Sequence, residues 1–447
     1  MSITITKAAV KKALAAHSWV GLLCAGLLYL ICVTGTVLVL YEEWQRVEQP
    51  AVPEMSSIPT EAVQRAVENV LASEAGQVPT THLYVHLPTD ALPRTTITTD
   101  TQAVHVRQDG SIAAPEENAW AEFLLALHYR LNLPAIVGMT IVGIVGAMML
   151  SLSLSGVLAH PRIFRDAFRL RARRRDQTAL ADWHNRLAVW TLPFGLAIAL
   201  TGAMIGLYYV SGYVMARTAY NGDTEAVTTA IFGSEPKVKG DSGTVPSVAT
   251  ALDYMEAQHP QVAPYYVVLH DPGTPEQHVQ VIGEHPQRLI FGEYYNFDGD
   301  GNFLSTAGMA DGTSGQQMAA SSYNLHFGNY GGLPVKSAYI VLGSLLSVIV
   351  ATGMYIWFAK ESRKGRRRSL ERAAWNGMVI GAPLMLSVTL ALRLSLGNAV
   401  PFEAVFWIGL TAFMTVVVWN SKPGREERYE EGASDLKLSA QSGSKAS

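Results

Sequence analysis

Cysteine is nearly absent from this chain of 447 residues, which contains only Cys24 and Cys32. The two lie about 12 Å apart along one expected helix, too far for a disulfide, so we expect both to be packing residues. No C-x-x-C-H sequence occurs, which excludes a covalently attached c-type haem. No strand is followed by G-x-G-x-x-G and a helix, which argues against a bound dinucleotide.

Charged residues are also scarce, at 16% of the chain, whereas 49% of the residues are hydrophobic. This balance is too apolar for most soluble proteins. A helix needs about 20 largely apolar residues to cross a bilayer. The stretches that meet this requirement are 17–41, 133–159, 187–210, 335–358, 375–394 and 403–420. The sequence therefore predicts a membrane protein with six spans.

Basic residues are sparse in two long segments and concentrated in two short ones. Segments 42–127 and 211–325 each hold four basic and thirteen acidic residues, whereas 162–186 holds eight basic residues and 360–372 holds seven. Because basic loops stay in the cytoplasm, we expect both termini there and both acidic segments on the other side. We expect the lipid bilayer as a partner and no nucleic acid.

The chain contains an internal duplication, since a shift of 167 residues superposes the first expected span on the third without a gap. The matched pairs are His17 with His184, Thr34-Gly35 with Thr201-Gly202, and, more loosely, Leu127-His128 with Leu325-His326 and Ser155-Gly156 with Thr352-Gly353. Each copy consists of a span out, an α+β segment and a span back. Both copies therefore enter from the same side, as parallel repeats about a pseudo-twofold axis along the membrane normal. The last two spans lack this pattern.

Four histidines occupy related places in the duplication. Topology puts His17 and His184 at the cytoplasmic ends of the first and third spans, and His128 and His326 at the opposite ends of the second and fourth. An ionisable residue in a span marks a functional site by default, and the pseudo-twofold axis should bring each pair together. Two imidazoles that face each other from different helices are the ligands of a bis-histidine haem. Two such pairs predict two b haems and an electron path across the membrane.

One further histidine and two arginines belong to this interpretation. His160 ends the second span at the same face as His17 and His184, and it could replace one of them as a ligand. Arg130 and Arg186 each follow a candidate ligand by two residues, and they could pair with haem propionates. Glycines on the first three spans could make room for a flat macrocycle, or they could only allow close helix packing.

Each acidic segment is predicted to fold as a small α+β unit. The first has an expected helix at 60–72 and strands at 82–87, 95–99 and 103–107, and the second has a helix at 247–258 and strands at 265–269, 278–282 and 293–297. His86 and His270 lie at equivalent strand ends and are candidate substrate contacts, or else solvated loop residues. Tyrosines of the second segment, Tyr265, Tyr266 and Tyr323 among them, are candidate contacts for a chelator, or else packing residues.

The histidine motifs carry a family resemblance. The sequences H-S-W-V-G-L-L at 17–23, L-H-Y-R-L at 127–131, W-H-N-R-L-A-V-W at 183–190 and L-H-F-G at 325–328 resemble those of the PepSY-associated transmembrane proteins. The likeness covers about residues 10–360, and within the family it is similar to the di-haem ferric-siderophore reductases of bacterial inner membranes. It implies a four-helix core, two b haems on the four paired histidines, with His160 as the alternative inner ligand, and two periplasmic PepSY-like domains. It also implies electron delivery to a ferric siderophore or another periplasmic iron chelate.

The expected fold is a membrane α-helical bundle, with a four-helix core of two parallel repeats, two C-terminal spans and two small periplasmic α+β PepSY-like domains. The expected division is 1–41 for the cytoplasmic N-terminus and first span, 42–127 for the first PepSY-like domain, 128–160 for the second span, 161–186 for a cytoplasmic basic loop, 187–210 for the third span, 211–325 for the second PepSY-like domain, 326–359 for the fourth span, 360–374 for a second basic loop, 375–394 and 403–420 for the last spans, and 421–447 for a disordered cytoplasmic tail.

We therefore expect a haem-dependent ferric reductase of the inner membrane. Its electrons would come from quinol or from a separate cytoplasmic reductase. Reduction of Fe(III) to Fe(II) would weaken the hold of a hard-oxygen chelator on the metal. The alternative is a non-enzymatic membrane anchor whose PepSY-like domains bind or restrain a periplasmic partner.

Overall fold

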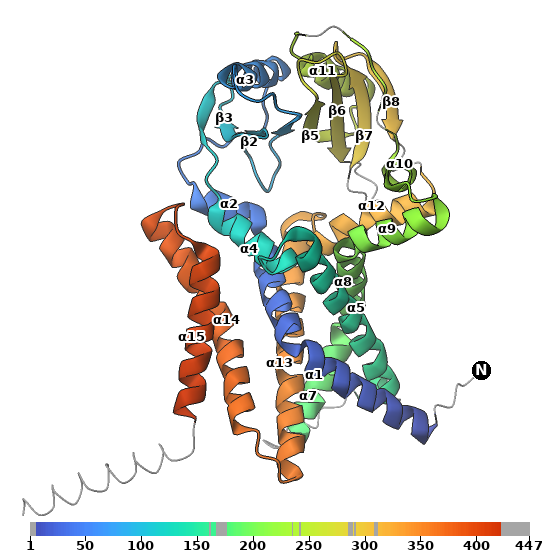
Figure 1. Ribbon diagram of the computed structural model, residues 1–447, viewed down its shortest axis with the longest axis vertical. Coiled ribbons are helices and arrows are strands. Elements are labelled where there is room, and N and C mark those ends of the chain that lie inside the picture. Colours follow the sequence, from blue (N-terminus) through green and yellow to red (C-terminus); the bar gives the residue numbers. More distant parts are fainter. Residues whose placement is uncertain are drawn as a thin grey trace, which may run out of the picture. The chain divides into compact units, whose positions relative to one another are not determined.

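The computed structural model describes residues 6–160, 162–166, 177–234, 236–240, 243–284, 289, 292–307 and 312–421 (Figure 1). The chain forms two compact units. The helical unit comprises residues 1–36, 148–195 and 342–447, and the sheet unit comprises residues 37–147 and 196–341. Much of the first basic loop, 161–186, and all but the first residue of the tail, 421–447, lie outside the described residues.

Long apolar helices confirm the expected membrane spans. Five helices are long and apolar enough to cross a bilayer, and they are α1 (Lys7–Leu38), α5 (Ala135–Ala159), α13 (Gly332–Arg363), α14 (Ser369–Leu396) and α15 (Phe402–Asn420). Large apolar side chains on them are exposed, such as Leu23 at 80% and Ile408 at 69%. Exposure of this kind suits lipid rather than water, and the chain is a multi-pass membrane protein.

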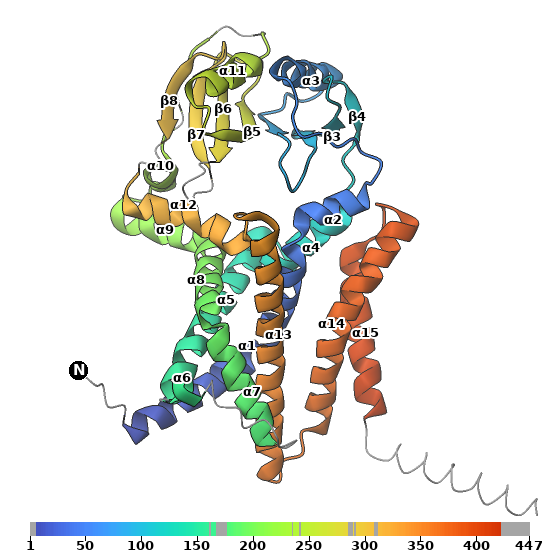
Figure 2. The same cartoon turned by 180° about the vertical axis from the view of Figure 1, so that it is seen from behind.

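The third expected span, 187–210, is bent rather than straight. Helix α7 (Gln177–Trp190) and helix α8 (Leu192–Gly206) meet at an angle of 67° (Figure 2). Pro193 lies in the first turn of α8, where its missing N–H is tolerated, but its ring prevents a straight continuation of α7. Counted as one broken span, this pair brings the described spans to six.

Four strands from each acidic segment combine into one sheet in the sheet unit. The strands are β1 (His82–His86), β2 (Thr95–Thr98), β3 (Ala103–Val106), β4 (Ile112–Pro115), β5 (Ala263–His270), β6 (His278–Glu284), β7 (Glu293–Asp298) and β8 (Phe303–Ala307), and their order is β4-β3-β2-β1-β5-β6-β7-β8. Strands β1 and β5 pair antiparallel, with Tyr84 opposite Val268. The expectation of two separate domains is therefore corrected to one eight-stranded antiparallel sheet.

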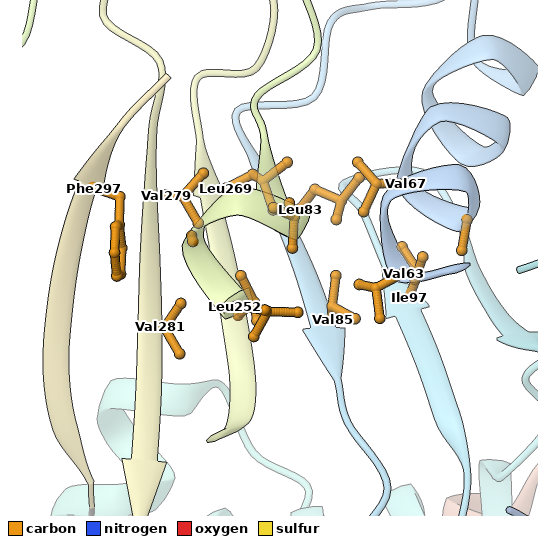
Figure 3. Close-up of a cluster of buried hydrophobic side chains, with 14 of the residues drawn as sticks. Val63, Val67, Leu83, Val85, Ile97, Leu252, Leu269, Val279, Val281 and Phe297 are labelled. Carbon is orange, nitrogen blue, oxygen red and sulfur yellow. The ribbon is translucent and has the colours of Figure 1, made fainter. Parts of the chain in front are cut away.

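One hydrophobic core runs under both halves of the sheet. Alternate residues of the strands, such as Leu83, Val85 and Leu269, point to one face and are fully buried. Helices α3 (Thr60–Ser73) and α11 (Val248–Gln258) cover this face (Figure 3). Neither half could close this core alone, because β1 and β5 lie at its centre.

Short helices flank the sheet and the spans, and they are α2 (Tyr41–Glu48), α4 (Ala119–Arg130), α6 (Ile163–Asp166), α9 (Tyr208–Ala219), α10 (Thr224–Phe232) and α12 (Ser314–Phe327). The expected spans 128–160 and 326–359 begin too early. His128 lies on α4 and His326 lies on α12, and each of these helices ends before the following span begins. Helix α4 ends where Leu131 and Asn132 adopt positive φ. Helix α12 ends at Gly328, which also has positive φ. Such residues terminate helices.

Candidate functional site

The helical unit contains a cavity of about 430 Å³. Most of its lining side chains are apolar, and His17, His160 and His184 are the histidines that line it. Its size lies within the range of small-molecule and cofactor sites. We call this cavity, together with His17 and His184, the cavity site.

The ring of His17 is held by helix α5. Its Nδ1 lies 3.0 Å from the carbonyl oxygen of Leu152 and 3.3 Å from Oγ of Ser155. A carbonyl oxygen only accepts, so Nδ1 carries the proton and Nε2 keeps its lone pair. Gly156 gives the ring its space, because a Cβ there would lie 3.3 Å from Cε1 of His17.

The ring of His184 is held in the same way by helix α13. Its Nδ1 lies 3.1 Å from Oγ1 of Thr352. That hydroxyl already donates to the carbonyl oxygen of Val348 at 2.8 Å, so it accepts from Nδ1–H, and Nε2 is again free. A Cβ at Gly353 would lie 3.2 Å from Cε1 of His184. Equivalent positions of the two repeats thus make equivalent contacts.

A second candidate site lies in the sheet unit. The rings of His128 and His326 have their centroids 6.2 Å apart, at an interplanar angle of 37°. We call these two residues the paired-ring site. Imidazole nitrogens bind metal ions at about 2 Å, with the ring centre about 1 Å further back, so two imidazoles on one metal ion have centroids about 6 Å apart. The observed separation of the ring centroids matches this value.

Helix α8 holds the ring of His326 through the hydroxyl of Thr201 and through Gly202, as α5 and α13 hold the other two rings. Nδ1 of His326 lies 3.0 Å from Oγ1 of Thr201, which donates to the carbonyl oxygen of Ala197 at 2.7 Å. The threonine oxygen therefore accepts from Nδ1–H, and Nε2 of His326 is free for a metal. A Cβ at Gly202 would lie 2.9 Å from Cε1 of His326, so the ring needs a glycine at this place.

The kind of metal centre follows from the number of ligands. Among the described residues, no group of three or more His, Cys, Asp or Glu side chains could hold a metal ion. A pair of histidines suits a metal that brings its own in-plane ligands, as haem iron does. The donor set and the spacing therefore fit a bis-histidine haem.

The two arginines differ in their surroundings. Nε of Arg130 is buried and has no hydrogen-bond partner among the described residues. A buried, unpaired donor is costly, and an anionic group would satisfy it. Gly138 packs against the backbone of Arg130, which fixes the end of α4. Arg186 is buried as well, but it already has an interaction within the protein.

His160 lines the cavity but lacks the features of the other ligands. It is exposed at the end of α5, and no side-chain hydrogen bond to its ring is found in the described part of the chain. No glycine contact shapes a place for its ring in the described chain. These differences favour His17 and His184 as the ligands of the cavity site.

Four other glycines of the spans have one of two different surroundings. Gly21 and Gly195 line the cavity. Gly143 and Gly206 instead bring α5 and α8 into contact, because a Cβ at Gly206 would lie 2.6 Å from Cα of Gly143. The two interpretations of the glycines therefore hold for different positions.

His86 and His270 do not share one cleft. Strands β1 and β5 are antiparallel, with His82 opposite His270 and His86 opposite Tyr266. His86 and His270 therefore lie at opposite ends of the β1–β5 pair. His86 contacts Tyr266 edge to face, with centroids 4.5 Å apart. His270 is buried and stacks on His278 at 4.2 Å. Substrate contact by either residue stays a prediction.

Sequence reasoning did not assign a role to the hydroxyl groups of Ser155, Thr201 and Thr352. A signal was present, because each precedes a glycine and each has a counterpart in the duplication: Thr201 matches Thr34 at the shift of 167 residues, and Ser155 matches Thr352 more loosely. Such partners fix the tautomer and the orientation of a metal-binding histidine.

Comparisons with known proteins identify the family of this chain. A family model described as PepSY-associated TM region matches residues 14–360, a range that includes both sites and ends before α14. An uncharacterized protein of Pseudomonas aeruginosa is 27% identical over 283 residues, which cover 59% of this chain and 71% of the relative.

Proposed function

Because this chain belongs to the family of PepSY-associated transmembrane regions and the rings of His17, His184 and His326 are each held through Nδ1, we propose that it is a di-haem electron carrier. One b haem would bind at the cavity site and one at the paired-ring site. A haem supplies a one-electron couple between Fe(III) and Fe(II). The absence of C-x-x-C-H favours b haem over c haem.

The observation that carries this proposal is the paired-ring site. Two histidines 6.2 Å apart in ring centroids, one of them fixed with Nε2 free by Thr201, fit one iron between them. Arg130 follows His128 by two residues, and its buried Nε would donate to a haem propionate. Such a charge-assisted bond is stronger than a neutral one.

The direction of transfer comes from the charge pattern. Basic loops at 162–186 and 360–372 adjoin the helices of the cavity site, and the acidic segments form the sheet unit. By the positive-inside rule, the cavity site would receive electrons at the cytoplasmic side and the paired-ring site would deliver them to the periplasm. The inner membrane is then the expected location, and quinol or a cytoplasmic reductase is the donor.

We assign a ferric siderophore or another periplasmic iron chelate as the acceptor. One electron converts Fe(III) to Fe(II), and no bond to carbon or proton transfer is needed. Fe(II) is held less strongly by hard oxygen ligands, so reduction releases iron for uptake. The enzyme would thus be a ferric reductase.

The test is a reduced-minus-oxidised spectrum of the purified full chain, with the haem content measured per protein. We expect a b-type α band and two haems. His17→Ala or His184→Ala should leave one haem, and His128→Ala or His326→Ala should remove the other. His160→Ala is the matched control and should retain two. A colourless wild-type protein would favour the alternative of a non-enzymatic anchor that binds a partner.

A further inference from the structure

An aromatic path leads from the paired-ring site to the surface of the sheet unit. Phe327 contacts the ring of His326 edge to face, with centroids 5.7 Å apart. Tyr323 stacks on Phe327 with centroids 4.3 Å apart and planes at 25°. Positions four apart lie on one face of a helix. Tyr323 is 36% exposed, so the path begins at a candidate ligand and ends at a partly exposed ring.

Other aromatic groups gather around Tyr323. Burial raises the pKa of Tyr265 and of Tyr266, and neighbouring tyrosine hydroxyls, including that of Tyr323, raise it further. Tyr266 contacts His86, which is exposed at the end of β1. Strand β5 and helix α12 therefore present their aromatic side chains near one another, and binding sites are commonly lined by such groups.

The charge near this surface is negative. Burial raises the pKa of the Tyr323 hydroxyl, and the carboxylate of Glu42 raises it further. The ammonium of Lys336 lies 3.0 Å from Glu42 and 2.7 Å from Glu43 and is shared by both, so it neutralises only one of the two carboxylate charges. The segments that form most of the sheet unit also hold far more acidic than basic residues. A negative surface attracts cations and repels anions.

We propose that the electron acceptor docks against Tyr323, beside Tyr265, Tyr266 and His86, and that it is a neutral or positively charged ferric chelate. This inference rests on the proposed function. One electron leaves the paired-ring site through the packed rings of Phe327 and Tyr323 and reduces one Fe(III) of the acceptor to Fe(II). No covalent bond forms or breaks, and no proton is transferred.

The experiment uses the full chain, reduced anaerobically and mixed in a stopped-flow instrument with cationic hexaammineruthenium(III), with anionic ferricyanide and with a neutral ferric trihydroxamate. Tyr323→Leu keeps an apolar side chain but removes the ring. We expect it to slow reoxidation by the trihydroxamate about tenfold, as for the loss of a stacking contact. Tyr323→Phe should keep the wild-type rate. Tyr213→Leu is the matched control, because Tyr213 is an exposed tyrosine of α9.

The outcomes separate the two proposals. If wild-type protein has no haem band, the proposed function fails. If the bands are intact and Tyr323→Leu reoxidises as fast as wild type, the docking site is wrong although the carrier function stands. Added salt should slow reoxidation of the protein by hexaammineruthenium(III) and accelerate its reoxidation by ferricyanide, because salt screens the negative surface. The opposite salt dependence would overturn the assigned charge of the acceptor.

Discussion

A hydroxyl group followed by a glycine holds a histidine ring at three places in this protein. Ser155-Gly156 faces His17, Thr352-Gly353 faces His184 and Thr201-Gly202 faces His326. At His184 and His326 the hydroxyl fixes the proton on Nδ1, at His17 the carbonyl oxygen of Leu152 does so, and the glycine leaves room for each ring. Each pair therefore orients an imidazole that is protonated on Nδ1 and keeps a lone pair on Nε2, and this tautomer can bind a metal through Nε2.

The hydroxyl of Thr201 should tune the paired-ring site. Thr201→Val removes the oxygen that accepts from Nδ1–H of His326 and makes the imidazole a weaker base. A weaker base stabilises Fe(III) less, so we expect a higher midpoint potential for one haem, together with about 10-fold to 100-fold weaker haem retention. Potentiometric titration of the haem bands measures both effects. Thr201→Ser keeps the hydroxyl and should behave as wild type, and an unchanged potential in the valine variant would refute the role.

The buried His270 should make the sheet sensitive to acid. Burial lowers its pKa to about 3, and His278 and His82 add to this effect. The unfolded chain then binds a proton below about pH 6.5 that the folded chain does not. Stability is therefore present above pH 6.5 and falls on acidification by up to about 1.4 kcal/mol per pH unit for this group. Hydrogen exchange of β5 and β6, corrected for intrinsic rates, should show this loss, and His270→Gln should reduce it.

Among the helices, α8 uses two glycines one turn apart for different purposes. Gly202 leaves space for the ring of His326, and Gly206 contacts Gly143 of α5. The same helix thus determines both the position of the His326 ring and the distance between α5 and α8. Small residues that let helices approach closely are common in membranes.

Substitution of these glycines should separate packing from ligand binding. Gly206→Ala places a Cβ against the α5 backbone, and we expect it to destabilise the protein by about 1–3 kcal/mol while two haems are retained. Gly202→Ala should displace the His326 ring and reduce haem at that site. Gly212→Ala is the matched control, because no atom lies within 4 Å of its added Cβ. Thermal unfolding and haem content measure the two effects, and equal results for all three variants would contradict the division of roles.

For the molecule as a whole, local patterns predicted the spans and most of the sheet elements. Runs of about 20 apolar residues suffice to identify spans, and period-two alternation identified six of the eight strands. The pairing of β1 with β5 was not predicted, because it joins two segments that two spans and a loop separate in sequence. The contacts of Thr201 and Thr352 escaped prediction for the same reason. The bend at Thr191 depends on a single residue, Pro193, within an otherwise uniform apolar run.

The central β1–β5 pair has a consequence for biogenesis. Strand β1 is synthesised well before β5, and in the proposed topology its edge stays unpaired until the third span has been inserted and the second acidic segment has followed. Exposed edges invite pairing with other chains. In that topology, translation arrest or slow insertion of the third span would leave a half-sheet whose unpaired β1 edge is prone to aggregation.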